Sequence, residues 1–385
     1  MPDTQKIALL IETSKAYGRG LLRSIGRYAQ LHDHWSLYVE ERALDDPIPD
    51  WLKTDEFDGV ILRARERSLM YEVLERGIPT ICLGEDNPPE ARTVVNDDAM
   101  SAVMAADHLL ERNFSHFAFV GIEGYVWSDI RRETFASKVE EAGYDLQVLE
   151  PGKKTNDMIR WDQIGHILAD WIADLPKPVG IMGCFDVMAR TVIDVCREIH
   201  VSVPEEVAII GVDNDQVLCE ASQPSLTSVA LDTRRIGFEA ASLLDRLMKG
   251  ENLVEHIVVP PLEVVTRGST DTLAIEDPQV AAALAFIRRN ACNGIEAGDV
   301  VEQVPLSRRT LERRFREQVG KSILTEIHHL RMSRVTQFLE ETDLKLDAIA
   351  VRCGFSHTPY MAAQFRKHFD MTPGEFRRRS REQGN

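Results

Sequence analysis

The chain has 385 residues, of which 44% are hydrophobic and 28% charged, a composition typical of two or three globular domains without a large disordered region. Its amino-terminal apolar stretch, Ile7–Ile11, is too short for a secretion signal or a membrane span, so we expect a cytoplasmic protein that engages no membrane. The net charge of −17 argues against nucleic-acid binding by the chain as a whole, but the balance is −22 in residues 1–277 and +5 in residues 278–385, which leaves the carboxyl-terminal segment able to approach phosphates.

Short apolar runs alternate with amphipathic segments through the first two-thirds of the chain. The runs predict buried strands, and the amphipathic segments predict helices. The predicted strands are residues 6–13, 35–41, 57–64, 78–84, 117–121, 179–184 and 207–212. The predicted helices are residues 17–30, 67–76, 100–111, 131–142, 162–175 and 187–200. Because such alternation produces parallel sheets covered on both faces, we expect an α/β fold of two lobes, with a ligand beyond the carboxyl ends of the strands.

The sequence predicts no cofactor and no metal. Gly18 and Gly20 follow the first predicted strand as in a dinucleotide-binding loop, but Arg23 stands where that loop needs its third glycine. We therefore interpret the two glycines as a flexible helix start. The six cysteines include no CxxC pair, and neither they nor the histidines have metal-site spacing, so we expect reduced thiols.

A different pattern begins after residues 271–277, which we interpret as a linker between a domain of residues 1–270 and a domain of residues 278–385. From residue 278 onward the chain is predicted to be helical. In residues 299–315, a short amphipathic helix is broken at Pro305. Ser307 then caps a second helix, whose buried stripe is expected to be Leu311 and Phe315.

Residues 346–369 repeat this layout. Ile349 and Ala350 lie on one predicted helix, Gly354 makes the turn, and Met361 and Phe365 are expected to face inward from the next helix. Two helices joined by a tight turn, with polar residues on the second, form a helix-turn-helix unit whose second helix fits the major groove. We therefore expect an all-α domain with two such units, bound to double-stranded operator DNA.

Particular side chains of the two recognition helices are expected to contact DNA. Arg309, Glu312 and Arg313 lie on the face opposite the buried stripe of the first helix and should meet base edges. Arginine can bind guanine through two hydrogen bonds, and glutamate can accept one from cytosine. Arg366 and Lys367, near the end of the second helix, should bind phosphates. The two helices should reach successive major-groove segments about 34 Å apart.

The carboxyl-terminal domain resembles that of the AraC-type activators, which also contains two helix-turn-helix units. The resemblance is carried by IA and CGF in residues 349–355, F-x-K-x-F in residues 365–369, TPGEFR in residues 372–377, and Ser307, Leu311, Arg313 and Phe315. Val301 and Pro305 depart from it, since alanine and glycine are usual there. The resemblance implies four more groove-facing residues: Thr358, Pro359, Tyr360 and Ala363. We expect these to read shape and thymine methyl groups.

Residues 5–270 resemble the ligand-binding core of LacI/GalR-type repressors, which is similar to periplasmic sugar-binding proteins. The matching pieces occur in that family's order, at residues 95–98, 107–110, 117–121, 210–213 and 224–229. That family binds DNA through an amino-terminal headpiece, a role that we expect the carboxyl-terminal domain to take here.

This second resemblance implies a sugar ligand held between two lobes. Arg131 and Asp213 are expected to bind its hydroxyl groups, and Asp186 is a further candidate. Three aromatic residues are candidates to pack on the sugar ring: Tyr17, Trp127 and Phe185. For each of them the alternative is ordinary core packing.

The combination of both domains resembles the activators of xylose operons. It implies D-xylose or a related sugar as inducer, a homodimer, and either sugar-dependent DNA binding or contact with RNA polymerase. A repressor of the same architecture, responding to another sugar, remains open because operator position decides between activation and repression. A solute-binding transport protein would need an export signal, and an NAD-dependent enzyme would need a complete glycine-rich loop. We therefore expect neither, and no catalytic residue is predicted.

Overall fold

The computed structural model describes residues 4–32, 34–44, 46–54, 56–64, 67–84, 87–88, 91–151, 161–251, 256–272, 274–275 and 277–383. The chain divides into two compact units, Met1–Thr272 and Leu273–Asn385. Among the helices formed by the described residues, none is both long and apolar enough to cross a membrane.

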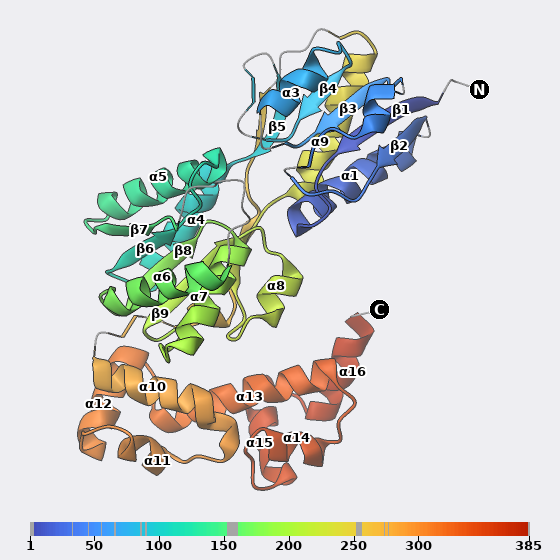
Figure 1. Ribbon diagram of the computed structural model, residues 1–385. Coiled ribbons are helices and arrows are strands. Elements are labelled where there is room, and N and C mark those ends of the chain that lie inside the picture. Colours follow the sequence, from blue (N-terminus) through green and yellow to red (C-terminus); the bar gives the residue numbers. More distant parts are fainter. Residues whose placement is uncertain are drawn as a thin grey trace. The chain divides into compact units, whose positions relative to one another are not determined.

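The first lobe of the first unit is built on a six-stranded sheet (Figure 1). Its strands are β1 (Gln5–Leu10), β2 (Trp35–Val39), β3 (Gly59–Leu62), β4 (Thr80–Cys82), β5 (Arg92–Asn96) and β11 (His256–Val259). They lie in the order β11-β5-β4-β3-β1-β2 and all pairs are parallel. The central strands are apolar throughout because α1 (Ala16–His32) and α9 (Thr233–Met248) pack on one face, and α2 (Asp50–Thr54) and α3 (Arg67–Leu74) on the other.

The second lobe contains the other six-stranded sheet. Its strands are β6 (Phe117–Val120), β7 (Leu146–Leu149), β8 (Val179–Gly183), β9 (Val207–Val212), β10 (Thr227–Ala230) and β12 (Glu263–Val265), in the order β12-β10-β9-β8-β6-β7. The helices of this lobe are α4 (Asp98–Leu110), α5 (Val126–Glu141), α6 (Trp161–Asp174), α7 (Asp186–Glu198), α8 (Gln216–Ala221) and the 3₁₀ turn η1 (Gly268–Thr270). The predicted α/β class is confirmed, with one exception: β12 runs antiparallel to β10 at the sheet edge.

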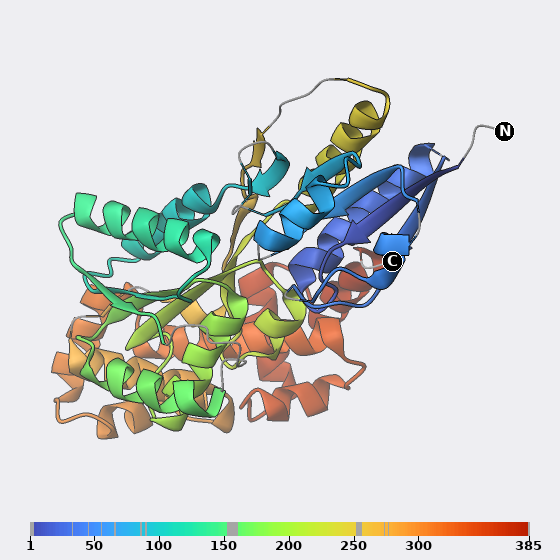
Figure 2. The same ribbon diagram turned by 45° about the horizontal axis from the view of Figure 1, so that its top comes forward.

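The chain passes between the two lobes three times. Figure 2 shows the region where the lobes meet with the top of the molecule turned forward. The crossings are Asp97 between β5 and α4, residues 231–232 between β10 and α9, and residues 260–262 between β11 and β12. Each lobe is therefore assembled from segments far apart in the sequence. Three short connections let the lobes rotate relative to each other while their sheets stay intact.

Two glycines that we interpreted as a flexible helix start have packing roles in α1. A Cβ on Gly18 would lie 2.0 Å from the carbonyl oxygen of Glu12, and a Cβ on Gly20 would lie 2.4 Å from Oγ1 of Thr233 at the start of α9. Only glycine allows these approaches without displacing the backbone or the neighbouring helix. Gly18 thus brings the first turn of α1 against the residues that follow β1.

Several boundaries differ from the predicted ones. α5 begins at Val126 rather than at residue 131, so Trp127 and Arg131 lie on successive turns of one helix. The early start was missed because Tyr125, at the cap position, makes no side-chain cap hydrogen bond. The strand predicted for residues 78–84 is only Thr80–Cys82. Three helices (α2, α8 and α9) and five strands (β5, β7, β10, β11 and β12) were not predicted.

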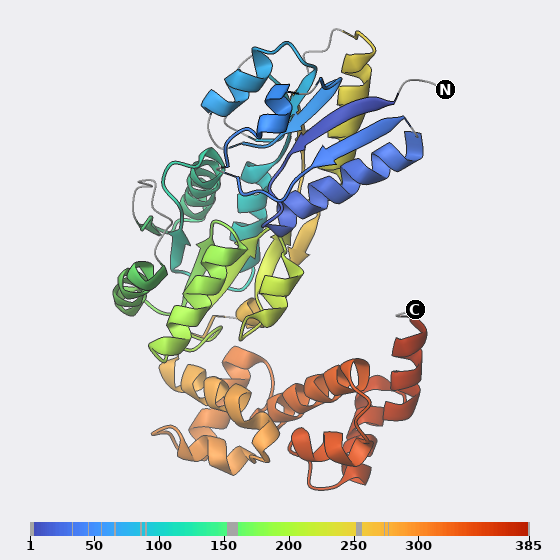
Figure 3. The same cartoon turned by 45° about the vertical axis from the view of Figure 1, so that its right-hand side comes forward.

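The second unit is helical, as predicted from residue 278 onward. Its elements are α10 (Pro278–Asn290), the 3₁₀ turn η2 (Ala291–Asn293), α11 (Ala297–Glu302), α12 (Arg308–Val319), α13 (Ile323–Glu341), α14 (Leu346–Arg352), α15 (Thr358–Phe369) and α16 (Pro373–Gln383). The long helix α13 joins the group α10–α12 to the group α14–α16, and Figure 3 shows the same helices from another side. Each group contains one short helix followed by a recognition helix, which is the expected pair of helix-turn-helix units.

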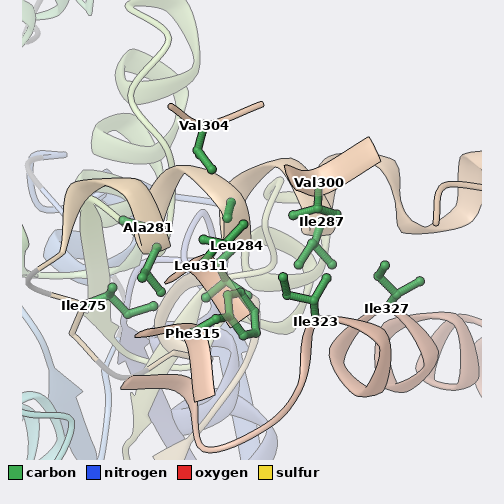
Figure 4. Packing of buried hydrophobic residues seen from close by; sticks show 12 residues of the cluster. Ile275, Ala281, Leu284, Ile287, Val300, Val304, Leu311, Phe315, Ile323 and Ile327 are labelled. Atoms are coloured by element: carbon green, nitrogen blue, oxygen red, sulfur yellow. The ribbon is translucent and has the colours of Figure 1, made fainter. Parts of the chain in front are cut away.

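Two separate apolar cores stabilise these groups, and α13 contributes to both. The first core, drawn in Figure 4, includes Leu311 and Phe315 together with Ile323 and Ile327 from the start of α13. The second core consists of the buried residues Met332, Val335, Leu339, Ile349, Ala350, Cys353, Phe355, Met361 and Phe365. The predicted inward faces of α12 and α15 are therefore confirmed.

Arg331 lies on α13 between the residues that serve the two cores. It is buried; its Nε donates to the carbonyl of Ala291 at 2.7 Å and its Nη2 to the carbonyl of Ile295 at 2.7 Å. Its guanidinium also lies 5.6 Å from the ring centre of Phe355, which belongs to the second core. One side chain thus connects the backbone before α11 to the turn between α14 and α15.

Candidate ligand site and DNA-binding helices

Polar and aromatic side chains of the first unit gather where strands of both sheets end. Glu12 follows β1, Arg63 follows β3, and Asn96 is the last residue of β5. In the second lobe Phe185 follows β8 and Asp213 follows β9. Because the carboxyl ends of parallel strands form the ligand-binding edge of such sheets, this group is the candidate site.

In the first lobe, a chain of contacts runs from Glu12 to Asn96. Arg63 Nη1 donates to Glu12 Oε1, and the Arg63 guanidinium lies 4.8 Å from the ring centre of Tyr17. The Tyr17 hydroxyl donates to Asn96 Oδ1 at 2.9 Å. Tyr17 is buried, so its ring packs within this network.

Asp98, the first residue of α4, extends the chain into the second lobe. Its Oδ1 accepts hydrogen bonds from Asn96 Nδ2 at 2.7 Å and from Arg131 Nε at 2.7 Å. Arg131 Nη1 also donates to the carbonyl of Cys184 at 2.5 Å. Burial of Arg131 opposes its ionisation, but Asp98 and Asp213 outweigh that effect and raise its pKa, so the guanidinium is charged.

Asp213 has an unusual backbone. Its φ is 108°, a region that non-glycine residues rarely adopt, and Asn214 beside it has φ 49°. The Asp213 carboxylate accepts no hydrogen bond from the residues that the structure describes. Burial raises its pKa to about 6; Arg131 and Arg63 act to lower that pKa, and Asp98 and Glu12 to raise it. A strained backbone that presents an ionisable group without a partner is typical of a binding site.

Asp186 differs from Asp213 because its hydrogen bonds lie within the fold. Its Oδ2 accepts from the backbone N–H of Asp215 at 2.7 Å, and its Oδ1 accepts from Ser228 Oγ at 2.5 Å. Ser228 Oγ in turn accepts from the N–H of Asn214 at 3.0 Å. Burial and the neighbouring Asp213 raise the pKa of Asp186 to about 8. Asp186 therefore holds the loop that carries Asp213.

Two of the aromatic candidates lie in contact with each other. Trp127 and Phe185 have ring centres 5.7 Å apart at an interplanar angle of 70°, and both are partly exposed. The Arg131 guanidinium lies 5.0 Å from the Trp127 ring centre, and Lys15 Nζ lies 5.7 Å from the Phe185 ring centre. These rings form an aromatic wall beside Arg131.

The structure thus connects Tyr17, Trp127, Phe185, Arg131 and Asp213 through contacts or charge interactions, and adds four residues that sequence reasoning missed: Glu12, Arg63, Asn96 and Asp98. The predicted strands 6–13 and 57–64 include Glu12 and Arg63, whereas β1 and β3 end before these residues, so their places at the strand ends were missed. Asn96 and Asp98 were missed because β5 was not predicted.

The far end of α4 is anchored by a second buried network. His108 Nε2 and Thr270 Oγ1 are 2.8 Å apart, and Thr270 Oγ1 is also 2.8 Å from Thr227 Oγ1. Arg112 Nε donates to the carbonyl of Thr270 at 2.9 Å. Burial, with a contribution from Arg112, lowers the pKa of His108 to about 4, so this imidazole is neutral. Thr270 lies two residues before the end of the first unit.

On α12, only part of the predicted contact face carries unpaired charge. Arg309 is exposed and forms no ion pair within the described part of the chain. Glu312 accepts from Arg308 Nε at 2.9 Å, and Arg313 pairs with Glu317 at 2.8 Å. Such exposed pairs contribute little stability and can exchange partners when DNA approaches.

The second recognition helix presents its predicted residues at its first turns. Pro359, Tyr360 and Ala363 are exposed, and Tyr360 exposes 45% of its surface although its ring is apolar. Thr358 Oγ1 donates to Asp347 Oδ1 at 2.6 Å, which fixes the start of α15 against α14. Gly354 makes the turn with φ 73°, and a Cβ there would lie 2.8 Å from the backbone of Cys292.

Two further residues predicted to contact DNA lie near the end of α15. Arg366 and Lys367 are both exposed. Neither side chain forms an ion pair within the described part of the chain, so both charges are available to phosphates.

Comparison with known proteins places the two units in known families. Residues 106–270 match the periplasmic binding protein-like domain and residues 300–379 match a helix-turn-helix domain. The xylose operon regulatory protein of Escherichia coli K12 is 34% identical over 384 residues, covering 97% of this chain and 96% of that protein. The protein of that name in Haemophilus influenzae is 33% identical over 383 residues, covering 97% and 98%. A solved structure of the xylose-binding transcription activator xylR has a TM-score of 0.83 at 31% identity and covers 98% of both chains.

Proposed function

The chain belongs to the family of xylose operon regulatory proteins, and on that premise we propose that its first unit binds D-xylose or a closely related sugar and thereby controls the binding of operator DNA by its second unit. The family consists of DNA-binding transcription regulators, so the chain is a regulator and not an enzyme. Its place of action is the cytoplasm, where it meets operator DNA.

The observation that carries the sugar proposal is the group of hydrogen-bonding side chains at the strand ends of both lobes. Arg131 supplies donors and Asp213 supplies acceptors, and the aromatic wall of Trp127 and Phe185 stands beside them. Sugars require this combination, because their hydroxyl groups need fixed polar partners and their C–H faces pack on aromatic rings. Asp186 is assigned a positioning role for the Asp213 loop.

The mechanism is closure of the two lobes around the sugar. The three crossings allow such a rotation, and a ligand that contacts both lobes binds the closed state more tightly than the open one. If the closed state also favours DNA binding, sugar and operator must raise each other's affinity by the same factor.

Sugar binding is tested by the thermal unfolding of the full chain in the presence of D-xylose, L-arabinose, D-ribose and D-glucose. A ligand at 100 times its dissociation constant stabilises the folded state by about 2.7 kcal/mol, which appears as a rise in melting temperature. A rise with D-xylose that is lost in Arg131→Ala supports the proposal. No rise with any sugar of the panel would refute it.

DNA recognition is tested by footprinting on the operator region. Each chain should protect two successive major-groove segments about 34 Å apart, one for α12 and one for α15. Protection of a single short segment per chain would contradict the use of both helices. Measuring operator affinity with and without sugar then tests the coupling between the units.

A homodimer and contact with RNA polymerase complete the proposal. Sedimentation of the full chain with and without sugar reports its assembly state. A reporter gene tested with and without sugar, in cells that have or lack this chain, separates activation from the alternative, a repressor of the same architecture. Loss of an activator lowers expression in the presence of sugar, whereas loss of a repressor raises expression in its absence.

A further inference from the structure

Two cysteines of the second unit lie against each other, although they belong to different helix-turn-helix groups. Cys292 is in η2, which follows α10 of the first group, and Cys353 caps the end of α14 in the second group. The thiol of Cys353 donates a hydrogen bond to the Cys292 sulfur. Both cysteines are free, so this contact between the groups is not covalent.

The backbone is closely packed around the two sulfur atoms. A Cβ on Gly354, in the turn between α14 and α15, would lie 2.8 Å from both the carbonyl carbon and the carbonyl oxygen of Cys292. Arg331 donates to the carbonyls of Ala291 and Ile295, on either side of that cysteine. The two thiols are thus held in contact by fixed chain segments, which is the arrangement from which a disulfide can form.

Cys292 has the properties of a reactive thiol. It is partly exposed, whereas Cys353 is fully buried. The hydrogen bond from Cys353 lowers the pKa of Cys292 to about 7, against an opposing effect of burial, and the guanidinium groups of α13 add to the decrease. Those guanidinium groups belong to Arg334 and Arg331. The same hydrogen bond and burial raise the pKa of Cys353, so Cys292 supplies the thiolate and Cys353 keeps its proton.

The other four cysteines of the chain lack these properties. They are buried in the first unit, and burial raises the pKa of each thiol: Cys82, Cys184, Cys196 and Cys219. A buried and protonated thiol reacts slowly with oxidants. Oxidation is therefore directed to the pair in the second unit, where an accessible thiolate lies next to a second thiol.

We propose that Cys292 and Cys353 are a redox-sensitive modification site, at which hydrogen peroxide converts the two thiols into a disulfide that joins the two helix-turn-helix groups. The Cys292 thiolate attacks one peroxide oxygen, the O–O bond breaks, and the departing hydroxide takes up a proton to become water. The sulfur of Cys353 then attacks the resulting sulfenic acid; the S–O bond breaks, and the hydroxide leaves with the Cys353 proton as a second water. Two thiols lose two electrons, and one peroxide is reduced to two waters.

The disulfide places a covalent bond where Arg331 now supplies hydrogen bonds between the groups. Each group carries one recognition helix, so the oxidised chain holds α12 and α15 at a fixed separation. In a reducing compartment the thiol form prevails, and the disulfide forms when peroxide accumulates.

The test is treatment of the full chain with hydrogen peroxide, followed by thiol counting and mapping of disulfide-linked peptides. The chain should lose two of its six thiols, form one disulfide between Cys292 and Cys353, and recover both thiols in dithiothreitol. In Cys353→Ser the sulfenic acid at Cys292 has no thiol to attack it and should be trapped by dimedone.

Cys196→Ala is the matched control, since it removes a buried thiol of the first unit and should form the same disulfide as the wild type. A disulfide between any other pair would overturn the proposal. Oxidation of Cys292 that is no faster than that of the buried thiols would also overturn it.

The unaltered chain also reports the effect of the link, independent of any folding defect in the variants. Closing the loop between Cys292 and Cys353 should raise the urea midpoint of the second unit by about 1–3 M and leave that of the first unit in place. One base pair inserted between the two protected operator segments should weaken binding at least about threefold more for the oxidised chain than for the reduced chain. An unchanged midpoint would overturn the link between the groups, and an equal loss for both forms would overturn its effect on DNA binding.

Discussion

Replacing Arg331 with methionine tests whether one side chain unites the two helix-turn-helix groups. The substitution keeps the unbranched stem against the cores and removes the donors to the carbonyls of Ala291 and Ile295. Hydrogen bonds from a charged donor are worth about 1.5–3 kcal/mol each. Methionine also relieves the cost of burying a guanidinium, so we expect a net loss of about 2–4 kcal/mol in the unfolding free energy of the second unit.

The two units can be followed separately in one denaturation experiment. All five tryptophans lie in the first unit, at positions 35, 51, 127, 161 and 171, so their fluorescence reports that unit alone. Far-ultraviolet circular dichroism reports the helices of both units, so unfolding of the second unit is the part of the dichroism change that the fluorescence transition does not account for. Arg331→Met should shift the dichroism transition to lower denaturant concentration and leave the fluorescence transition in place.

Arg334→Met is the matched control, because Arg334 is exposed one turn further along the same helix. Its guanidinium lies 4.9 Å from the ring centre of Phe338, so the control should change stability by no more than about 1 kcal/mol. Operator affinity should fall in Arg331→Met and not in the control. If both transitions of Arg331→Met coincide with those of the wild type, the buried hydrogen bonds do not hold the groups together, and the reasoning fails.

Three further outcomes follow from the geometry. Arg309→Ala should cost about 1–3 kcal/mol of operator affinity and relax specificity at one base pair. Lys367→Ala should weaken binding to all sequences alike and lower by about 1 the slope of the logarithm of the binding constant against the logarithm of the salt concentration. A binding-site selection at several salt concentrations distinguishes the two variants. The affinity for sugar should decline as the pH falls through about 6, because hydroxyl donors of the ligand favour the ionised form of Asp213. The pKa of Asp213 is then lower in the complex than in the free protein. A sugar affinity that calorimetry finds constant between pH 5 and 7.5 would contradict this. Gly211→Ala places a Cβ 2.3 Å from Asp186 Oδ1 and should destabilise the first unit by about 1–3 kcal/mol, measured by fluorescence-monitored denaturation. Gly165→Ala is the control: no atom lies within 4 Å of its added Cβ, so it should not destabilise the first unit.

Much of the fold could be predicted from local patterns, because buried parallel strands such as β1, β3 and β9 are short apolar runs that only two-sided burial explains. The strands that escaped prediction, such as β7 and β11, lie at or near sheet edges, where exposed positions break the apolar run. The helix α9 had a cap signal in Asp232, but nothing local assigns it to the first lobe. That assignment depends on the second crossing between the lobes.

The residues of the candidate site also fall into those that local sequence patterns indicate and those whose role depends on partners distant in sequence. Arg131 and Asp213 were expected at the site because they match a family pattern, and Asp213 directly follows the recognisable strand β9. Glu12 and Asp98 could not be predicted in this way, because what distinguishes them is the arginine that each carboxylate contacts and the second carboxylate oxygen, which has no hydrogen-bond donor among the described residues. Those partners are Arg63 and Arg131, and each pair is formed by residues distant in sequence. Only the folded structure shows which acidic residues keep a buried carboxylate oxygen without a hydrogen-bond donor among the described residues.

Helix α4 has one end at each of the two buried networks, with Asp98 at its start and His108 in its last turn. A helix of this length is a stiff rod of about 20 Å, so it cannot absorb a displacement at one end by bending. We therefore expect a displacement of Asp98 along the helix axis to be transmitted through His108 to Thr270, two residues before the end of the first unit. Substitutions at His108 or Arg112 are expected to change how strongly the response depends on ligand binding while leaving the ligand contacts themselves unaltered.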